Sequence, residues 1–117
     1  MVRTAAQILA DNVKAIREEL GESQAAFATR CDISQRVVSN IEKGGEISHS
    51  KINIVQNIAG GVGVTVAAIF IDHSDRSIES IRRAGQAIAL VGSLYPEHQR
   101  RIIEIAGDYT NMTPRKT

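Results

Sequence analysis

The chain has 117 residues, a formal net charge of +1 and an aromatic content of 3%, with no tryptophan and a single cysteine. This length fits one domain, or one small domain with an appendage. The charge is far from the strongly basic balance of a non-specific nucleic-acid binder. A single cysteine excludes an internal disulfide framework and a metal site built from several cysteines. A core so poor in aromatic residues must be aliphatic, which suits packed helices better than a β-sandwich.

Membrane insertion and secretion are not expected from the apolar segments. No stretch approaches the roughly 20 apolar residues needed to span a bilayer. The first segment is interrupted by Asp11 and Lys14, so it does not resemble a secretory signal. We therefore expect a soluble, cytoplasmic protein with no membrane partner.

The first third of the chain predicts three helices. Apolar residues at helical spacing indicate a helix over 5–20, and Gly21 is a typical residue to end it in the left-handed conformation. Ser23 suits the N-cap of a short helix over 24–31, and Ser34 suits the N-cap of another over 35–43. Gly44 and the glycine after it should end this third helix.

Four more helices are expected in the rest of the chain. A fourth follows an N-cap at Ser50 and ends in the glycine cluster at 60, 61 and 63, and a short fifth runs from a cap at Thr65 to Phe70. A long helix should begin near Ser74 or Asp75, and a final one has Pro96 and Glu97 in its first turn. Residues 113–117 are predicted to form a flexible tail. The apolar positions of the last two helices are Ile78, Ile81, Ile88, Val91 and Leu94, then Ile102, Ile103, Ile105, Ala106 and Tyr109.

The stretch from Ser23 to Lys43 is the most informative one. It consists of two short predicted helices separated by a turn of three or four residues. Ala28 is small where the helices must cross, and Ile33 in the turn, with Val38 and Ile41, should close the wedge between them. This arrangement leaves one face of the second helix exposed, and a single helix fits the major groove of DNA.

These residues resemble the phage repressor and Cro-like family of helix-turn-helix regulators. The resemblance covers about 7–71 and rests on residues at the family's spacing: Gln24, Phe27-Ala28, Ile33-Ser34, Val38-Ser39, Ile41-Glu42, Ile58-Ala59, Val62-Gly63-Val64 and Ile69-Phe70. It implies an all-α fold with a five-helix lambda-repressor-like DNA-binding domain over 1–71, and the helical spacing of apolar residues after it predicts a helical extension over 72–112. Asp32 stands where the family commonly has glycine, which is tolerable because Asp can adopt the left-handed conformation. The loop over 44–50 is longer than usual and lacks the common proline, so we carry over no DNA contacts there.

The resemblance also implies the DNA contacts. Gln35, Arg36 and Asn40 occupy the base-reading positions, and Gln24, Ser39 and Lys43 the phosphate-contacting ones. The chemistry fits, since arginine pairs with guanine and Gln or Asn with adenine. One such domain makes few contacts, so a homodimer on a palindromic operator, with half-sites about 34 Å apart, is expected.

The C-terminal extension leaves two arrangements open. Its isoleucine stripes, at 78, 81 and 88 and at 102 and 105, either pair between subunits or pack back on their own domain. The expected function is sequence-specific transcriptional regulation, most simply repression of the phage or prophage type. One alternative is an antitoxin whose extension binds a toxin protein while the helix-turn-helix represses its own operon. Another is a protein-interaction module that has lost DNA binding, against which Arg36 and Lys43 argue.

No catalytic, metal or cofactor site is expected. His49, His73 and His98 are scattered without ligand spacing, and Cys31 falls at a position typical of a buried, inert thiol. The glycine cluster at 60–63 lacks both a preceding strand and the Lys-Ser/Thr of a phosphate-binding loop. The run at 72–75 contains triad residue types, but adjacency does not provide triad geometry. We therefore do not expect an enzyme.

Overall fold

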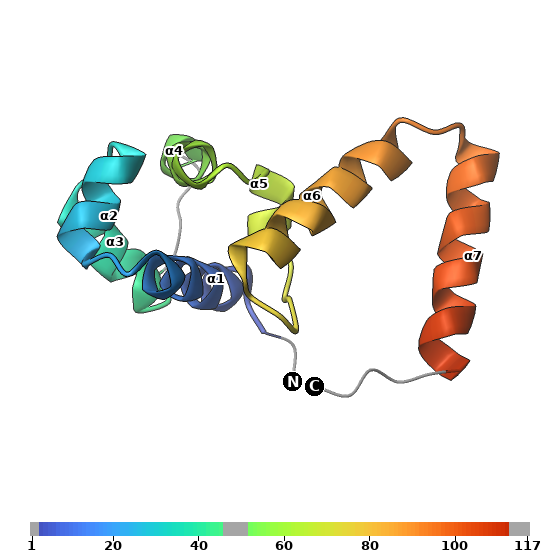
Figure 1. The fold of residues 1–117 in the computed structure, drawn as a ribbon, viewed down its shortest axis with the longest axis horizontal. Coiled ribbons are helices and arrows are strands. Elements are labelled where there is room, and N and C mark those ends of the chain that lie inside the picture. The colour runs from blue at the N-terminus through green and yellow to red at the C-terminus, as the bar shows by residue number, and fades with distance from the viewer. Residues whose placement is uncertain (1–2, 46–51, 113–117) are drawn as a thin grey trace.

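The computed structural model of the chain describes residues 3–45 and 52–112, and it confirms the all-α fold class: every regular element in those two ranges is a helix (Figure 1). The helices are α1 (Ala5–Leu20), α2 (Gln24–Cys31), α3 (Gln35–Glu42), α4 (Ile52–Val62), α5 (Val66–Ile69), α6 (Ile78–Gly92) and α7 (Pro96–Met112).

The expected caps set the ends of the short helices. The hydroxyl oxygens of Ser23, Ser34 and Thr65 each accept a hydrogen bond from a backbone N–H in the first turn that follows, at 3.1, 3.2 and 3.2 Å. Gly21 (φ 67°) ends α1 and Asp32 (φ 55°) ends α2, both in the left-handed conformation. Asp32 therefore adopts the backbone geometry that glycine would supply there.

Two predicted boundaries are wrong. Gly60 and Gly61 lie inside α4, and of the glycine cluster only Gly63 (φ 85°) follows its end. α6 begins at Ile78 rather than near 74, because the Asp75 carboxylate accepts from the Ser77 backbone N–H (2.9 Å) and Ser77 is the N-cap. The expected cap at Ser50 lies outside the described residues.

The core joins α1–α5 to the first part of α6. Its buried members are almost entirely aliphatic, with Phe27 as the one aromatic side chain in the cluster; the others are Leu9, Val13, Ile16, Ala28, Cys31, Val38, Ile41, Val55, Ile58, Ala68, Ile69, Ile78 and Ile81. The packing therefore continues past the predicted division at residue 71. Ile78 and Ile81, expected as part of a stripe that pairs between subunits or packs back, are covered by their own domain.

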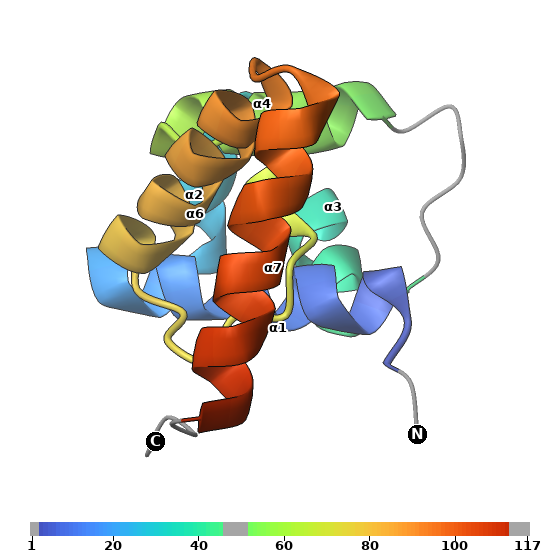
Figure 2. The same ribbon diagram turned by 90° about the vertical axis from the view of Figure 1, so that its right-hand side faces the viewer.

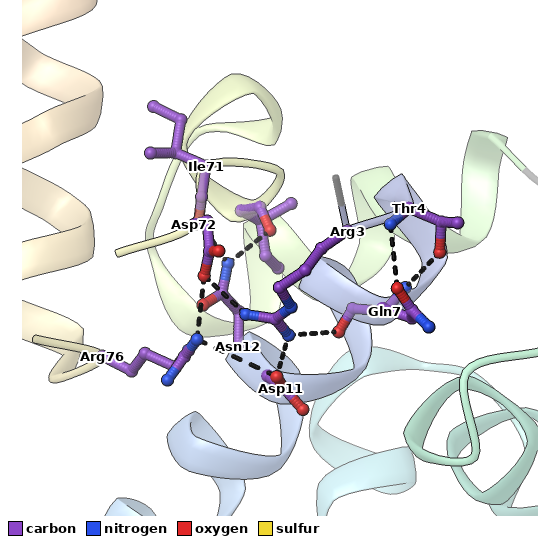
Figure 3. Close-up of polar contacts among 9 residues, drawn as sticks. Arg3, Thr4, Gln7, Asp11, Asn12, Ile71, Asp72 and Arg76 are labelled. Atoms are coloured by element: carbon purple, nitrogen blue, oxygen red, sulfur yellow. Dashed lines mark hydrogen bonds and ion pairs between the residues drawn. The ribbon is translucent and has the colours of Figure 1, made fainter. Parts of the chain in front are cut away.

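Polar contacts fix the end of α5 on α1 (Figure 3). The side chain of Asn12 is fully buried and donates to the carbonyl oxygens of Ile69 (2.8 Å) and Ile71 (2.9 Å). Beside it, Asp72 accepts from both Arg3 (2.7 Å) and Arg76 (2.8 Å). The segment between α5 and α6 is thus tied to the first helix, which orients α6.

The helices spread along the long axis of the molecule. In Figure 1, α2 and α3 lie at one end and α7 at the other, with α6 reaching across between them. In the view turned by 90°, α7 is nearest the viewer, at the end of the molecule away from α2 (Figure 2). None of the α7 side chains over 96–107 is buried.

Candidate nucleic-acid interface

α3 is held by its apolar side and exposes its polar side. Val38 is fully buried and Ile41 is 7% exposed, and α3 packs on both α1 and α2. Ala28 is 3% exposed, as expected of a small residue between the crossing helices, and Ile33 is half-buried in the turn. The predicted wedge is confirmed, and the other face of α3 is free to meet a partner.

Five of the six predicted DNA-contacting residues lie on α3 or at its C-cap. The side chains of Gln35, Arg36, Asn40 and Lys43 are exposed, and that of Ser39 is half-buried. The helical period brings these five positions to one face of α3, since residues four apart are neighbours on a helix surface. Their contacts with DNA remain predictions that rest on the resemblance.

The one acidic residue of α3 is turned inward and neutralised. Glu42, whose side chain is 7% exposed, accepts two hydrogen bonds from the Arg17 guanidinium, from Nε at 2.7 Å and from Nη2 at 2.9 Å. These bonds raise the pKa of Arg17 above its usual value, and the arginine stays charged. With Glu42 paired, Arg36 and Lys43 are the charges on the exposed face of α3, which is positive although the chain is near neutral.

Gln24, the sixth predicted residue, lies at the start of α2 and is half-buried. Its Nε2 donates to Glu42 Oε1 at 3.3 Å, so its amide helps to hold the inward carboxylate. Arg17 Nη1 also donates to the Glu22 carbonyl oxygen at 3.0 Å. The network therefore links α1, the start of α2 and the end of α3.

Sequence reasoning missed this pairing of Arg17 with Glu42. The two residues are 25 positions apart, so no local spacing signals the contact. Sequence reasoning also did not single out Arg3 and Gln7. They line an open depression beside Lys43, between the start of α1 and the end of α3.

The cysteine and two of the histidines considered in the sequence analysis contact other parts of the protein. Cys31 is 2% exposed, and burial raises the pKa of its thiol to about 11, so the expectation of a buried thiol is confirmed. The ring of His73 lies 2.7 Å, at Nε2, from the Ala68 carbonyl oxygen, and His98 meets the edge of Tyr95. His49 lies outside the described residues. Within 3–45 and 52–107, no three metal-ligating side chains come together.

The comparison with known families identifies the domain. Residues 13–69 match the model of the helix-turn-helix family HTH_3, the type found in Cro and lambda-repressor-like regulators, and the match begins in α1 and ends with α5. Residues 13–69 therefore form an XRE-type helix-turn-helix domain, the kind that DNA-binding transcriptional regulators carry. No curated protein and no solved structure matches the chain. Among the described helices, none has the length and apolarity to cross a bilayer.

Proposed function

We propose that the protein is a repressor that occupies a palindromic operator as a dimer, with α3 in the major groove. The observation that carries this proposal is the exposed face of α3, where polar and basic side chains gather and the only acid of the helix is paired inward. A carboxylate on that face would repel phosphates, so its neutralisation favours contact with a polyanion.

Each side chain has a role that matches its chemistry. Arg36 pairs with guanine, and Gln35 and Asn40 with adenine. Lys43, with Gln24 and Ser39, contacts phosphates and sets the register. The setting that we propose is phage or prophage control in the cytoplasm, by binding alone and without catalysis or a cofactor.

The first experiment is in vitro selection from randomised duplex DNA at roughly physiological salt. We expect a two-fold symmetric site to be enriched, with half-sites about 10 base pairs apart. Failure to enrich any sequence would contradict the proposal.

Two substitutions then test the assignment of α3. Arg36→Ala should cost about 1–3 kcal/mol of specific binding and relax the preference at one base position. Lys43→Ala should weaken binding to all sequences alike and flatten the salt dependence. The matched control is Arg83→Ala, because Arg83 is an exposed arginine on α6, outside the helix-turn-helix, with 71% of its side chain accessible. An unchanged base preference in Arg36→Ala would show that this placement of the recognition residues is wrong.

A second candidate function is that of an antitoxin. The exposed apolar residues of α6 and α7 favour it, because they offer a surface on which a toxin protein would dock. A small, unrelated protein that co-purifies with the chain in a fixed ratio, and whose activity the chain abolishes, would support this function.

A further inference from the structure

An open depression lies between the start of α1 and the end of α3, beside the face that is proposed to enter the major groove. Its volume is about 400 Å³, and its lining includes Gln7, Ala10, Lys43 and Gly44. Lys43 is also one of the five positions on the exposed face of α3. The depression therefore continues that face from α3 onto α1.

The two acidic side chains in the lining of the depression are both paired with arginine. Glu42 accepts two hydrogen bonds from the guanidinium of Arg17. Asp11 is paired with Arg3, whose guanidinium also donates to Asp72 at 2.7 Å (Figure 3). These arginines offset carboxylates that would otherwise repel an anion at this surface.

Two hydrogen-bond donors in the lining are left for a partner. Lys43 is exposed, and its ammonium group forms no hydrogen bond or ion pair with any described residue. Gln7 is exposed as well. Its Oε1 accepts from the Thr4 backbone N–H at 2.9 Å, and its Nε2 donates to no acceptor within 3–45 and 52–107. An ammonium group and an amide N–H beside paired carboxylates are complementary to phosphate oxygens.

The position of the depression matches that of a DNA backbone. The major groove is about 12 Å wide and an α-helix with its side chains is about 10–12 Å across, so a helix in the groove has phosphates along both sides. α1 flanks α3, to which the pair of Arg17 and Glu42 ties it. An open surface also suits a strand that lies across it better than a small ligand, which a binding site usually encloses.

We propose that this depression receives the phosphate backbone of the DNA, with Lys43 Nζ and Gln7 Nε2 as the donors. The footprint of the protein then extends from α2 and α3 to the first turn of α1. Arg3 is a positioning residue, because it offsets the charge of Asp11 and is already held by its own acceptors. This inference rests on the proposed function and adds to it a contact surface on α1.

Gln7→Glu is the first test variant. Glutamate keeps the side-chain oxygen that accepts from the Thr4 N–H, so the capping box at the start of α1 is preserved while a negative charge enters the depression. Binding should weaken about tenfold, equally for the selected operator and for a duplex of random sequence, because phosphate contacts carry no base information. Fluorescence anisotropy at constant salt measures both affinities.

The matched control is Gln86→Glu, the same change at an exposed glutamine of α6, outside the helix-turn-helix. Salt screens an exposed charge beyond about 8–10 Å, so neither affinity should change by more than about twofold in this control.

Gln7→Lys is the second test variant, and it predicts a gain that a folding defect does not produce. Lysine adds one phosphate contact, so the plot of log Kobs against log salt concentration should become steeper by about 0.9. Affinity and salt dependence that stay unchanged in both Gln7 variants would overturn the inference. If inorganic phosphate alone saturates the NMR signal of Gln7 while duplex binding responds to neither variant, the depression takes a free anion and the inference is equally wrong.

The outcomes separate this inference from the proposed function. The random duplex tests backbone contact without an operator. A response to the Gln7 variants, together with failure to select any site, would contradict the repressor and retain the contact surface on α1. A relaxed base preference in Arg36→Ala with no response at Gln7 would retain the repressor and remove that surface.

Discussion

At the scale of single residues, the ion pair between Arg17 and Glu42 affects both the stability of the domain and the charge on the exposed face of α3. Arg17 and Glu42 form two hydrogen bonds between α1 and α3, and their side chains are 17% and 7% exposed. Removing one member of a buried pair leaves the other charge without compensation, which costs more than the intact pair contributes. The pair also keeps a carboxylate away from the face of α3 that is proposed to meet phosphates.

Arg17→Ala should therefore lower the free energy of unfolding by about 2–3 kcal/mol, as measured by urea denaturation. The double variant Arg17→Met/Glu42→Leu should recover most of this loss, because apolar side chains of similar volume remove both charges together. Arg30→Ala is the control, since its pair with Glu22 lies at the surface and should contribute little. If the double variant were less stable than Arg17→Ala, uncompensated charge would not be the cause of the loss.

At the scale of elements, the close contact between α4 and α2 depends on one glycine. A Cβ on Gly61 would lie 3.1 Å from the Arg30 carbonyl oxygen and 3.2 Å from the Cys31 Cα, both backbone atoms of α2. Its neighbour Gly60 faces open space. Two adjacent glycines of one helix thus differ only in what surrounds them, which makes them a matched pair.

Gly60→Ala should raise the free energy of unfolding by about 0.5–1 kcal/mol, because alanine reduces the entropy that a helical glycine loses on folding. Gly61→Ala gains the same entropic stabilisation, but its added methyl group must push α4 away from α2. The Gly61→Ala variant should therefore be less stable than Gly60→Ala. Thermal unfolding of both variants measures the difference. Equal stabilisation by the two substitutions would mean that α2 yields to the added methyl group at no cost.

At the scale of the whole molecule, a near-neutral chain presents the locally positive face of α3 at one end and the exposed apolar residues of α7 at the other (Figure 1). The net charge of +1 therefore says little about DNA binding, because pairing decides which charges reach the surface. One helix-turn-helix makes few base contacts, so two linked copies should bind a palindrome more tightly than one.

A dimer that forms through the exposed apolar residues of α6 predicts that Leu90→Glu weakens binding to the selected palindrome by roughly tenfold or more, while the affinity for a single half-site changes little. Fluorescence anisotropy on both duplexes measures this difference, with Ile52→Glu as the control for added charge. Equal losses on the two duplexes would show that residue 90 acts on the DNA-contacting domain itself.

Much of this protein follows from its sequence. The caps at Ser23, Ser34 and Thr65 and the helical spacing of aliphatic residues determine α1, α2, α3 and α5, because capping and periodicity act over a few neighbouring residues. The spacing of the residues over 23–44 also identified the helix-turn-helix before its geometry was known.

Other features were decided only by the tertiary structure, because they depend on residues far apart in the chain. Gly60 and Gly61 suggest a helix end, yet α4 continues through both to Val62, and Gly61 lies closely against α2. The inward pairing of Glu42 needs Arg17 from another helix. The division of α6 into a buried and an exposed half depends on how far α1–α5 extend along it. One apolar stripe runs through both halves, and the periodicity within a helix does not show which part of that stripe another element covers.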